Sequence, residues 1–469
     1  MTKTQRIRDT VHSLIEFDMG DFEQTCWKVL NTRPMQRLRR IKQLGFSEFV
    51  YPGACHSRFA HSVGVFHTAR QLAGVVRRRL GDDKFDTDEA RLAVASALVH
   101  DVGHGPFSHA FEDALKRVGI AKRHELRTKQ ILDETDVRRA CDEFSSFPDR
   151  IGELIEASYP KNIYCSIVSS QFDADRLDYI RRDRLMSGTQ QSGIDYDWLI
   201  GNLHVRDVPI QMDGLKIGKA PALVIDEKSV VAAEGYIFSL LYLYMNVYFH
   251  KTTRGIEKIF SALIELLADR VRNGSWAVTG LPRNHPLVRF LGDPEAIEPF
   301  LELDDTVIMG GLSMLATSED SAIAELAQRI RDRRIYACID VTKRMAAKFG
   351  LPEEGEVGGE SESARRARVA ARVARVGELA IERGLLAKGD DGIAGVLEDT
   401  APRSPYKRAS DGSPTLSRIH VIGADGKLHD LAEMSSAVNA LGDFKAYRLY
   451  ARNDSDREAI EKLIGDASQ

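Results

Sequence analysis

The chain has 469 residues, of which 43% are hydrophobic and 29% are charged. This length exceeds what a single compact core usually holds and predicts two or three packed units of an ordinary globular protein. The net charge of −4 comes from 65 Lys and Arg against 69 Asp and Glu. It argues neither for nor against nucleic acid, so that such a partner is possible but not indicated.

The five cysteines are odd in number and lack paired spacing, which excludes a disulfide framework and a thiolate zinc site. No apolar signal core follows Met1–Arg6. The most apolar stretch, 236–249, is interpreted as too short for a membrane-spanning helix and as broken by Ser239 and Asn246. We therefore expect a soluble, cytoplasmic protein without a membrane partner.

Helical periodicity dominates the chain, and the fold class is predicted to be mainly α with small β elements. The segments that favour helices are 92–99, 110–115 and 256–271. The segments that favour strands are 203–211, 216–225, 418–422 and 446–451. Beyond a Glu- and Gly-rich stretch at 352–362, the segment 364–376 is an Arg- and Ala-rich helix, and 399–414 is expected to be rich in loops.

The residues that suggest chemistry lie between 36 and 183. The doublet His100-Asp101 follows the apolar run 93–99, where ionisable groups are usually paired or bound to a metal. The glycines that follow allow close approach of the backbone to a ligand. With His61 upstream and Asp175 downstream, two imidazoles and two carboxylates form a nitrogen and oxygen set suited to Fe, Mn, Zn or Mg. Such an ion polarises phosphoryl oxygens and activates water.

His109 and Glu112 are three residues apart and therefore share one face of a helix. This spacing is typical of a general acid that a carboxylate holds and tunes. His124 could bind a substrate phosphate or relay a proton. Capped or surface histidines are the alternative for both positions.

Four segments, 37–45, 51–62, 100–109 and 173–183, carry a specific resemblance in their residues, order and spacing. They closely resemble the HD-domain deoxynucleoside triphosphate triphosphohydrolases, a family that includes the SAM-and-HD-domain restriction factor of vertebrates and bacterial relatives. The resemblance covers about residues 5–260, whereas the C-terminal part matches only in general character.

The resemblance implies a role for each matching residue. The ligands of one divalent metal ion, whether Mn, Fe, Zn, Ni, Co or Mg, would be His61, His100, Asp101 and Asp175. The triphosphate would be held by Arg58, His104, His124, Arg176 and Tyr179. The sugar 3′-hydroxyl would bond Gln43 and Asp183, and the 2′ position would be crowded by Leu44 and Tyr248. Attack at the α-phosphorus and protonation of the leaving 5′-oxygen would be assisted by His109 and Glu112.

Helical spacing agrees with three of these roles. Arg58 lies three residues before His61 and therefore on the same helical face. Arg176 and Tyr179 flank Asp175 closely enough for the three side chains to converge. Tyr248 lies one turn after Tyr244, for which plain core packing is the favoured interpretation.

The chain departs from the family pattern at two places. Relatives usually carry an arginine about two turns before the tyrosine at 248, whereas this chain has Ser239-Leu240-Leu241 there. One phosphate contact is therefore missing or supplied from elsewhere. Members activated by guanine nucleotides have an aspartate just before the segment Gln36–Arg39, where this chain has Asn31-Thr32-Arg33. An amide cannot accept two N–H bonds from guanine as a carboxylate can, so another nucleotide could be the activator.

Together with the composition shift after residue 351, the resemblance predicts four parts. They are an N-terminal segment at 1–30 with possible nucleotide or oligomer contacts, an HD phosphohydrolase core at 31–345, a linker or surface insertion at 346–376 and a C-terminal α+β lobe at 377–469. The expected activity is hydrolysis of deoxynucleoside triphosphates to deoxynucleoside and inorganic triphosphate in a homo-oligomer, as a dimer, tetramer or hexamer. Two alternatives are an HD phosphohydrolase or phosphodiesterase for another nucleotide, and a regulatory protein that binds nucleotides or nucleic acid.

Overall fold

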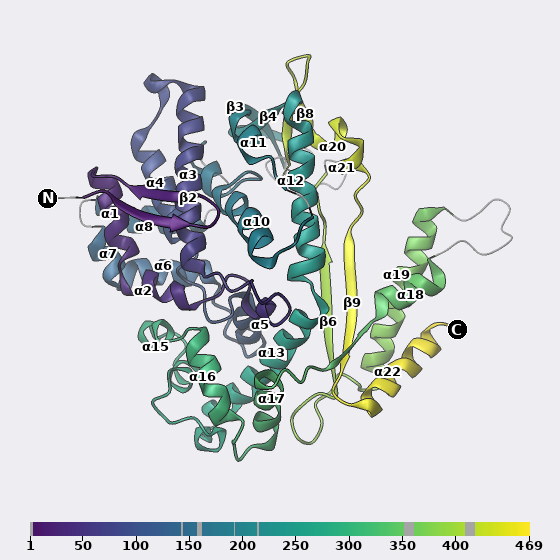
Figure 1. Cartoon of the computed structure of the whole chain (residues 1–469). Helices are drawn as coiled ribbons and strands as arrows, with labels where there is room; N and C mark the ends of the chain where they lie inside the picture. The colour runs from purple at the N-terminus through teal and green to yellow at the C-terminus, as the bar shows by residue number, and fades with distance from the viewer. Residues whose placement is uncertain are drawn as a thin grey trace.

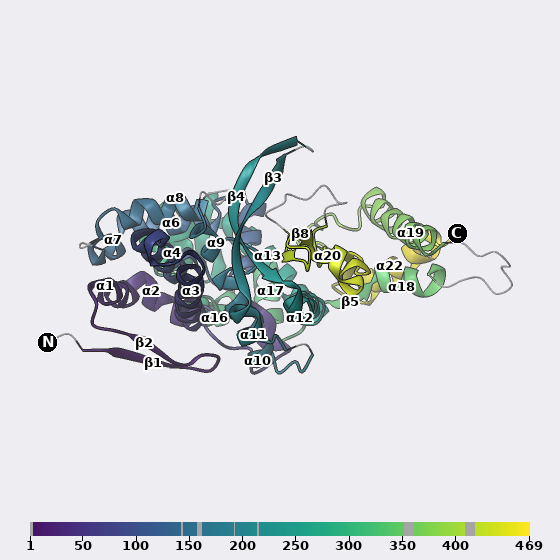
Figure 2. The same cartoon turned by 90° about the horizontal axis from the view of Figure 1, so that it is seen from above.

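The protein is described by a computed structural model that covers residues 3–141, 144–156, 162–191, 193–212, 215–350, 361–408 and 418–469. Helices dominate these residues, as predicted, and small sheets lie between and beside them (Figure 1). The helices of the first two thirds of the chain form one broad mass. Three helices near the C-terminal end, α18 (Val341–Phe349), α19 (Glu362–Glu382) and α22 (Asp454–Ala467), lie beyond a pair of long strands, β6 (Val396–Arg403) and β9 (Phe444–Ala451) (Figure 1). The view from above shows the same three helices at one end of the molecule (Figure 2).

The first two thirds of the chain contain most of the helices. Their bounds are α1 Asp21–Leu30, α2 Arg33–Arg37, α3 Arg58–Leu80, α4 Thr87–Val99, α5 His109–Arg117, α6 His124–Glu134, α7 Asp136–Ala140, α8 Phe147–Glu156, α9 Cys165–Val168, α10 Ala174–Ser187, α11 Tyr196–Gly201, α12 Val230–Leu243, α13 Lys251–Arg272, α14 Pro286–Gly292, α15 Ile297–Leu301, α16 Asp305–Leu315 and α17 Ser321–Arg331. The remaining helices are α18 Val341–Phe349, α19 Glu362–Glu382, α20 Leu431–Met434, α21 Ser436–Asn439 and α22 Asp454–Ala467. All the helices expected from periodicity are confirmed.

The strands form a hairpin and two larger sheets. Their bounds are β1 Gln5–Asp9, β2 Ser13–Phe17, β3 Leu203–Met212, β4 Leu215–Asp226, β5 Ala337–Asp340, β6 Val396–Arg403, β7 His420–Ile422, β8 Leu428–Asp430 and β9 Phe444–Ala451. The four predicted strands are confirmed. The orders are β1-β2, β3-β4-β7-β8 and β5-β9-β6, and Ile225 of β4 pairs in parallel with Val421 of β7.

The expectation of loop over 399–414 is wrong for its first five residues, because they belong to β6. This strand pairs along its whole length with β9, from Val396 opposite Ala451 to Arg403 opposite Phe444. β6 lies at an edge of its sheet, where Pro402 is tolerated because one side of an edge strand needs no N–H donor. Residues 409–414 of that stretch lie outside the described residues. The same holds for residues 351–360 of the expected linker.

Several helices begin or end close to one another at the residues singled out in the sequence. The hydroxyl of Ser57 accepts a bond from the Ala60 amide and starts α3, which places Arg58 and His61 in its first turn. Asp173 caps α10 in the same way through the Arg176 amide, so that Asp175 lies in that first turn. α4 ends directly before His100, and α5 begins at His109.

Two glycines allow these elements to approach closely. A Cβ at Gly64 of α3 would lie 2.1 Å from Oδ1 of Asp178 on α10. A Cβ at Gly103 would lie 2.2 Å from the carbonyl oxygen of His124. Neither distance leaves room for a side chain, so glycine sets the approach of α3 to α10 and of the 100–108 loop to α6.

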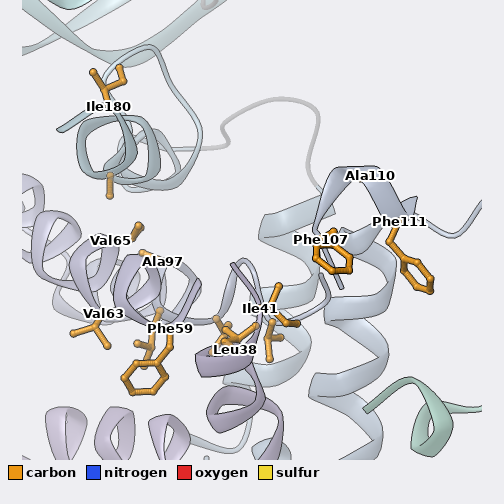
Figure 3. Packing of buried hydrophobic residues seen from close by; sticks show 14 of the residues in the cluster. Leu38, Ile41, Phe59, Val63, Val65, Ala97, Phe107, Ala110, Phe111 and Ile180 are labelled. Carbon is orange, nitrogen blue, oxygen red and sulfur yellow. The ribbon is translucent and has the colours of Figure 1, made fainter. Parts of the chain in front are cut away.

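One large hydrophobic core joins these helices. Figure 3 shows part of it, with Phe59 and Val63 of α3 near Leu38 and Ile41, and with Phe107 and Phe111 from the segment around the start of α5. A second hydrophobic cluster, from Ile339 to Ala467, packs α18, α19 and α22 against β9. This second cluster is the core of what we call the C-terminal lobe. The four-part division of the chain stays a prediction in its bounds.

The apolar stretch at 236–249 does not end at Ser239 or Asn246, and the expectation that it is too short was wrong. Residues Glu227–Tyr248 form a continuous helical stretch of 22 residues, which by length and composition alone could cross a membrane. In this structure the stretch is part of the fold, since Tyr236 and Ile237 are buried. Its last turn, Tyr244–Tyr248, is π-helical, a distortion that is frequent at functional sites.

Candidate functional site

The four predicted metal ligands lie together. Nε2 of His61 is 2.9 Å from Oδ1 of Asp175 and 3.7 Å from Oδ2 of Asp101. Nε2 of His100 is 3.4 Å from Oδ1 of Asp101 and 3.7 Å from Oδ1 of Asp175. Ligand atoms about 2.1 Å from a shared ion, at angles of roughly 90 to 110°, lie about 3.0 to 3.4 Å apart. His61, His100 and Asp101 therefore lie close enough together to hold one ion, and Asp175 lies within 3.7 Å of both imidazoles.

The two imidazoles are oriented by their Nδ1 atoms. Nδ1 of His100 donates to the carbonyl of Ala97 at 2.8 Å, and Nδ1 of His61 donates to Oδ2 of Asp178 at 2.8 Å. Both Nε2 atoms then face the carboxylates, and Nε2 of His100 is buried without a hydrogen-bond partner. This is the arrangement of metal-binding histidines, whose other nitrogen is held by a carbonyl or a carboxylate. The residues present therefore fit a divalent cation.

The carboxylates around the two imidazoles also favour a positive charge between them. Burial alone would lower the pKa of His61, but its hydrogen bonds to Asp175 and Asp178 raise that pKa to about 10. Burial raises the pKa of Asp101, yet Arg58 and His100 hold it well below its ordinary value. Arg58 donates to Asp101 through Nη1 and to Oγ of Ser108 through Nε at 2.7 Å. The site is thus built to hold a cation among ionised carboxylates.

Asp178 was not assigned a role from the sequence, although it lies three residues after Asp175 on α10. Its carboxylate is buried and also accepts from Nε and Nη2 of Arg182, at 2.8 and 3.0 Å, and lies 2.7 Å from Nε2 of His12. Arg182 continues the network to Asp9, at 2.8 and 3.1 Å. The N-terminal hairpin therefore supports the carboxylate that orients His61. Helical spacing could have suggested Asp178, whereas no pattern pointed to His12.

We predict that Asp178→Asn lowers the affinity for the metal by about 10- to 100-fold, because the amide no longer attracts the Nδ1 proton of His61 as a carboxylate does. Metal titration of the apoprotein measures this. Asp9→Asn is the matched control, since it removes the other carboxylate on Arg182 without touching His61. Equal losses in the two variants would show that the network acts through stability and not through His61.

A second cluster, of three histidines and a carboxylate, lies beside the first. Glu112 is 3.5 Å from Nδ1 of His109 and 3.3 Å from Nδ1 of His124. The ring of His124 stacks on that of His104 at 3.9 Å, and Nε2 of His104 is 3.3 Å from Asp101. Burial raises the pKa of Glu112, but the hydrogen bonds with His109 and His124 lower it far more. Glu112 is therefore ionised, and its carboxylate can accept hydrogen bonds from His109 and His124.

A pocket of about 470 Å³ opens in front of these clusters, a volume that is typical of small-molecule sites. It is lined by nine of the predicted residues, namely Gln43, Leu44, Arg58, His109, Asp175, Arg176, Tyr179, Asp183 and Tyr248. The other six predicted residues are joined to this wall by the contacts described above. The structure therefore brings together the predicted metal, catalytic and substrate-binding side chains, which are spread between Gln43 and Tyr248 in the sequence.

The predicted sugar end of this pocket has a carboxylate fixed from two sides. Oδ2 of Asp183 accepts from the hydroxyl of Tyr248 at 2.7 Å, and Oδ1 lies 2.8 Å from Nε2 of His56. Oε1 of Gln43, on the same wall, is buried without a hydrogen-bond partner. An unpartnered amide oxygen beside a fixed carboxylate suits the recognition of a hydroxyl group. Tyr244 packs against the hydrophobic core, as expected, and it also lines the pocket.

The loop before α5 has a strained backbone. Phe107 and Ser108 have positive φ angles of 53° and 57°, which non-glycine residues rarely adopt. The carboxylate of Asp305 holds this conformation by accepting from the Phe107 amide at 2.7 Å and from the Lys42 amide at 2.9 Å. It thereby fixes the segments that carry His109 and Gln43. No sequence signal marked Asp305, which lies about 200 positions beyond the loop that it supports.

The two departures from the family pattern have different surroundings. Leu240, in the region without the arginine, is buried. A cation reaches the pocket instead from the C-terminal lobe, in Arg403 of β6. Asn31 is exposed at the end of α1 and donates to the carbonyl of Trp27 at 2.8 Å. Nearby, Nε of Arg39 donates to Oε1 of Gln36 at 2.8 Å, and its guanidinium stacks on Phe59 at 3.6 Å.

All five cysteines are free in the structure, in agreement with the sequence. Two of them are buried in the helical core, Cys26 and Cys141. Their surroundings are apolar, and burial raises the pKa of the Cys26 thiol well above its ordinary value. None of the five is among the residues that line the pocket, and the chemistry of the site therefore falls to histidine and carboxylate groups.

Comparisons with known proteins agree with this geometry. A family model described as HD domain matches residues 58–179, which hold all four proposed metal ligands. The uncharacterized protein YwfO of Bacillus subtilis is 30% identical over 357 residues, which cover 75% of this chain and 76% of that protein. A deoxynucleoside triphosphate triphosphohydrolase SAMHD1 homolog of Dictyostelium discoideum is 28% identical over 351 residues, or 71% of this chain and 60% of that protein.

The fold is also found in solved structures. A phosphohydrolase from Bacteroides thetaiotaomicron superposes with a TM-score of 0.70 at 23% identity, over 96% of this chain and 100% of that chain. A hypothetical protein from Aquifex aeolicus superposes with a TM-score of 0.67, also at 23% identity, over 99% of this chain. Both likenesses extend through the C-terminal lobe, and at this level of identity they establish the fold alone.

Proposed function

Because the chain belongs to the family of HD-domain phosphohydrolases, we propose that it hydrolyses deoxynucleoside triphosphates to deoxynucleoside and inorganic triphosphate with the help of one divalent metal ion. The observation that carries the proposal is the position of the ligand cluster. His61, His100, Asp101 and Asp175 lie at the wall of a pocket whose other walls hold arginines and hydroxyl-recognising groups. A bound divalent ion supplies charge stabilisation at a phosphoryl oxygen and lowers the pKa of water.

The side chains of the pocket suit the two parts of such a substrate. Arg176 lies beside Asp175 on α10 and can bind phosphate, because a guanidinium matches the geometry of phosphate oxygens. Gln43 and Asp183 can bind the 3′-hydroxyl of the sugar. Leu44 and Tyr248 lie on the same walls, where their bulk would oppose a 2′-hydroxyl. This pairing favours deoxynucleotides over ribonucleotides.

His109 and Glu112 provide the proton for the leaving group. Water adds to the α-phosphorus and loses a proton to solvent, the bond to the 5′-oxygen breaks, and that oxygen takes a proton from His109. The side chain of His109 is 73% exposed, so the proton can be replaced from solvent. Glu112 is ionised and lies 3.5 Å from Nδ1 of His109, so that it can orient the imidazole toward the leaving group.

The similarity to the SAMHD1 homolog supports a further part of the proposal, that the protein acts as a homo-oligomer. A second nucleotide could act as an activator. Asn31 replaces the carboxylate expected for guanine recognition, which favours another base. We also propose that the enzyme is soluble and cytoplasmic.

A substrate panel tests the function. We expect metal-loaded protein to release inorganic triphosphate from deoxynucleoside triphosphates, alone or with a second nucleotide present, and to release far less from ribonucleoside triphosphates. Ion chromatography separates triphosphate from pyrophosphate and phosphate. Release of pyrophosphate or phosphate alone would point to an HD phosphohydrolase of another nucleotide. Tight nucleotide binding without turnover would point to a regulatory protein, and either result would overturn the proposal.

A further inference from the structure

Four arginines line the pocket, and they differ in how their charge is used. Arg58 is committed to Asp101 and Ser108. Arg254 donates to Asp399 at 3.0 and 2.7 Å and to Glu257 at 2.7 Å. Arg176 donates to the carbonyl of Ser170 at 2.7 Å and lies 3.8 Å from Asp173. Three of the four guanidinium groups are therefore already engaged with protein oxygens.

The fourth arginine, Arg403, keeps its charge available. Among the described residues no carboxylate pairs with it, and its Nε is shielded from solvent without a hydrogen-bond partner. A half-buried cation with an unsatisfied donor costs free energy unless a ligand supplies the missing acceptor. The side chain lines the same pocket as Asp175 and Arg176. Its environment is therefore that of a group that binds an anion.

The position of this guanidinium is built by the surrounding structure. Its carbon lies 3.9 Å from the centroid of the Tyr244 ring, and that ring packs edge to face on Tyr248 at 4.9 Å. A cation stacked on an aromatic face keeps its plane fixed and its N–H groups free at the edge. Tyr248 is in turn bonded to Asp183. Arg403 is thus oriented by the same π-helical turn that forms the sugar end of the pocket.

The strand that carries Arg403 is also held against the pocket. Arg403 of β6 is paired with Phe444 of β9, and Phe444 stacks on Phe249, which directly follows Tyr248. Nη1 of Arg448, also on β9, donates to the carbonyl of Phe249 at 2.7 Å. The sheet of the C-terminal lobe and the end of the π-helical turn are therefore joined at two places, which keeps Arg403 at the pocket wall.

We propose that Arg403 binds the polyphosphate of the nucleotide, so that the C-terminal lobe completes the active site. This inference rests on the function proposed above and adds a substrate-binding residue to it. A guanidinium presents several N–H donors in one plane and can bond two phosphate oxygens at once. Together with Arg176 on α10, it places a second cationic group at the phosphate chain. The C-terminal lobe then contributes directly to substrate binding.

The test measures binding separately from turnover. Inorganic tripolyphosphate is titrated calorimetrically into the full-length, metal-loaded protein, and a deoxynucleoside without phosphate is titrated in parallel. We expect Arg403→Gln to weaken tripolyphosphate binding by about tenfold, the loss expected for one charge-assisted hydrogen bond, and to leave deoxynucleoside binding unchanged. In turnover, KM should rise by a similar factor while kcat changes little. Arg403→Lys, which keeps the charge, should recover part of the affinity.

Two further variants make the test decisive. Arg366→Gln removes an exposed arginine of the same lobe, which pairs with Glu362 far from the pocket, and it should bind tripolyphosphate as the wild type does. Arg403→Met keeps the length of the side chain and serves if the glutamine variant does not fold. The proposal is overturned if wild-type protein does not bind tripolyphosphate, if neutral variants at 403 bind it normally, or if they lose deoxynucleoside binding equally. Arg403-dependent binding without hydrolysis of any deoxynucleotide would instead refute the proposed function and leave this inference standing.

Discussion

Replacement of Asp101 by alanine is expected to reduce the hydrolysis of deoxynucleoside triphosphates by at least roughly 10³-fold, because charge stabilisation by a metal ion contributes several kcal/mol to such reactions. Asp101 faces both imidazoles of the cluster, at 3.7 Å from His61 and 3.4 Å from His100. Its loss leaves the two histidines and Asp175 without the buried carboxylate between them. Initial rates and the metal content of the purified variant together measure the effect.

The buried guanidinium of Arg58 complicates this variant, because it loses its carboxylate partner. An unpaired buried charge destabilises a protein strongly. Asp101→Asn keeps the size of the side chain and an acceptor for Arg58, and it should lose metal and activity while remaining folded. Asp88→Ala, at the exposed start of α4, the helix that ends just before His100, is the control and should behave as the wild type. Wild-type rates in both Asp101 variants would contradict the proposed metal site.

Replacement of His109 by alanine is expected to reduce kcat by about 10²- to 10⁴-fold, the range of a positioned general acid. The side chain is largely exposed and packs little, so the thermal unfolding midpoint should stay close to that of the wild type. Metal content should also stay unchanged, since the described contacts of His109 are with Glu112 and with the rings of His104 and His124. Steady-state kinetics, calorimetric unfolding and metal analysis measure the three quantities.

A substrate with a better leaving group separates general acid catalysis from substrate binding. When sulfur replaces the 5′-oxygen of the deoxynucleotide, the deoxynucleoside leaves as a thiolate, which needs little protonation. The defect of His109→Ala should therefore shrink markedly on this substrate, whereas the defect of Asp101→Asn should persist. His429→Ala, in β8 of the C-terminal part, is the control for removing a histidine. An equal defect on both substrates would mean that His109 does not protonate the leaving group.

The residues of the metal cluster could be predicted because their signals are local. His100-Asp101 follows an apolar helix, and Asp175 lies in the first turn of a helix capped by Asp173. Caps and periodicity act over a few residues, so they can be read from neighbouring positions. The resemblance of four ordered segments then assigned a role to each side chain. The HD-domain match over 58–179 covers the four metal ligands.

Errors in the sequence interpretation arose where local composition competed with tertiary packing. Pro402 and its neighbours indicated a loop, yet pairing with β9 extends the strand to Arg403. Ser239 and Asn246 indicated helix breaks, yet Ser239 is buried inside the helix and Asn246 bonds the carbonyl of Tyr242. In both cases the contacts of the folded chain, with distant residues or with residues one turn away, outweigh the weak preference of single residues for a loop or a helix break.

The sequence by itself determined the helical class, the ligand types and the order of the motifs, because these depend on spacing within single segments. Only the tertiary structure decided which distant residues serve the site. His12 reaches Asp178 across 166 positions, Asp305 holds the Phe107 amide across 198, and Arg403 enters the pocket from the C-terminal lobe. None of these residues belongs to a motif, since each acts through contacts made only when the chain packs. A buried charge or amide without a partner costs free energy, so burial decides which groups must pair. This requirement produces no repeating pattern in the sequence.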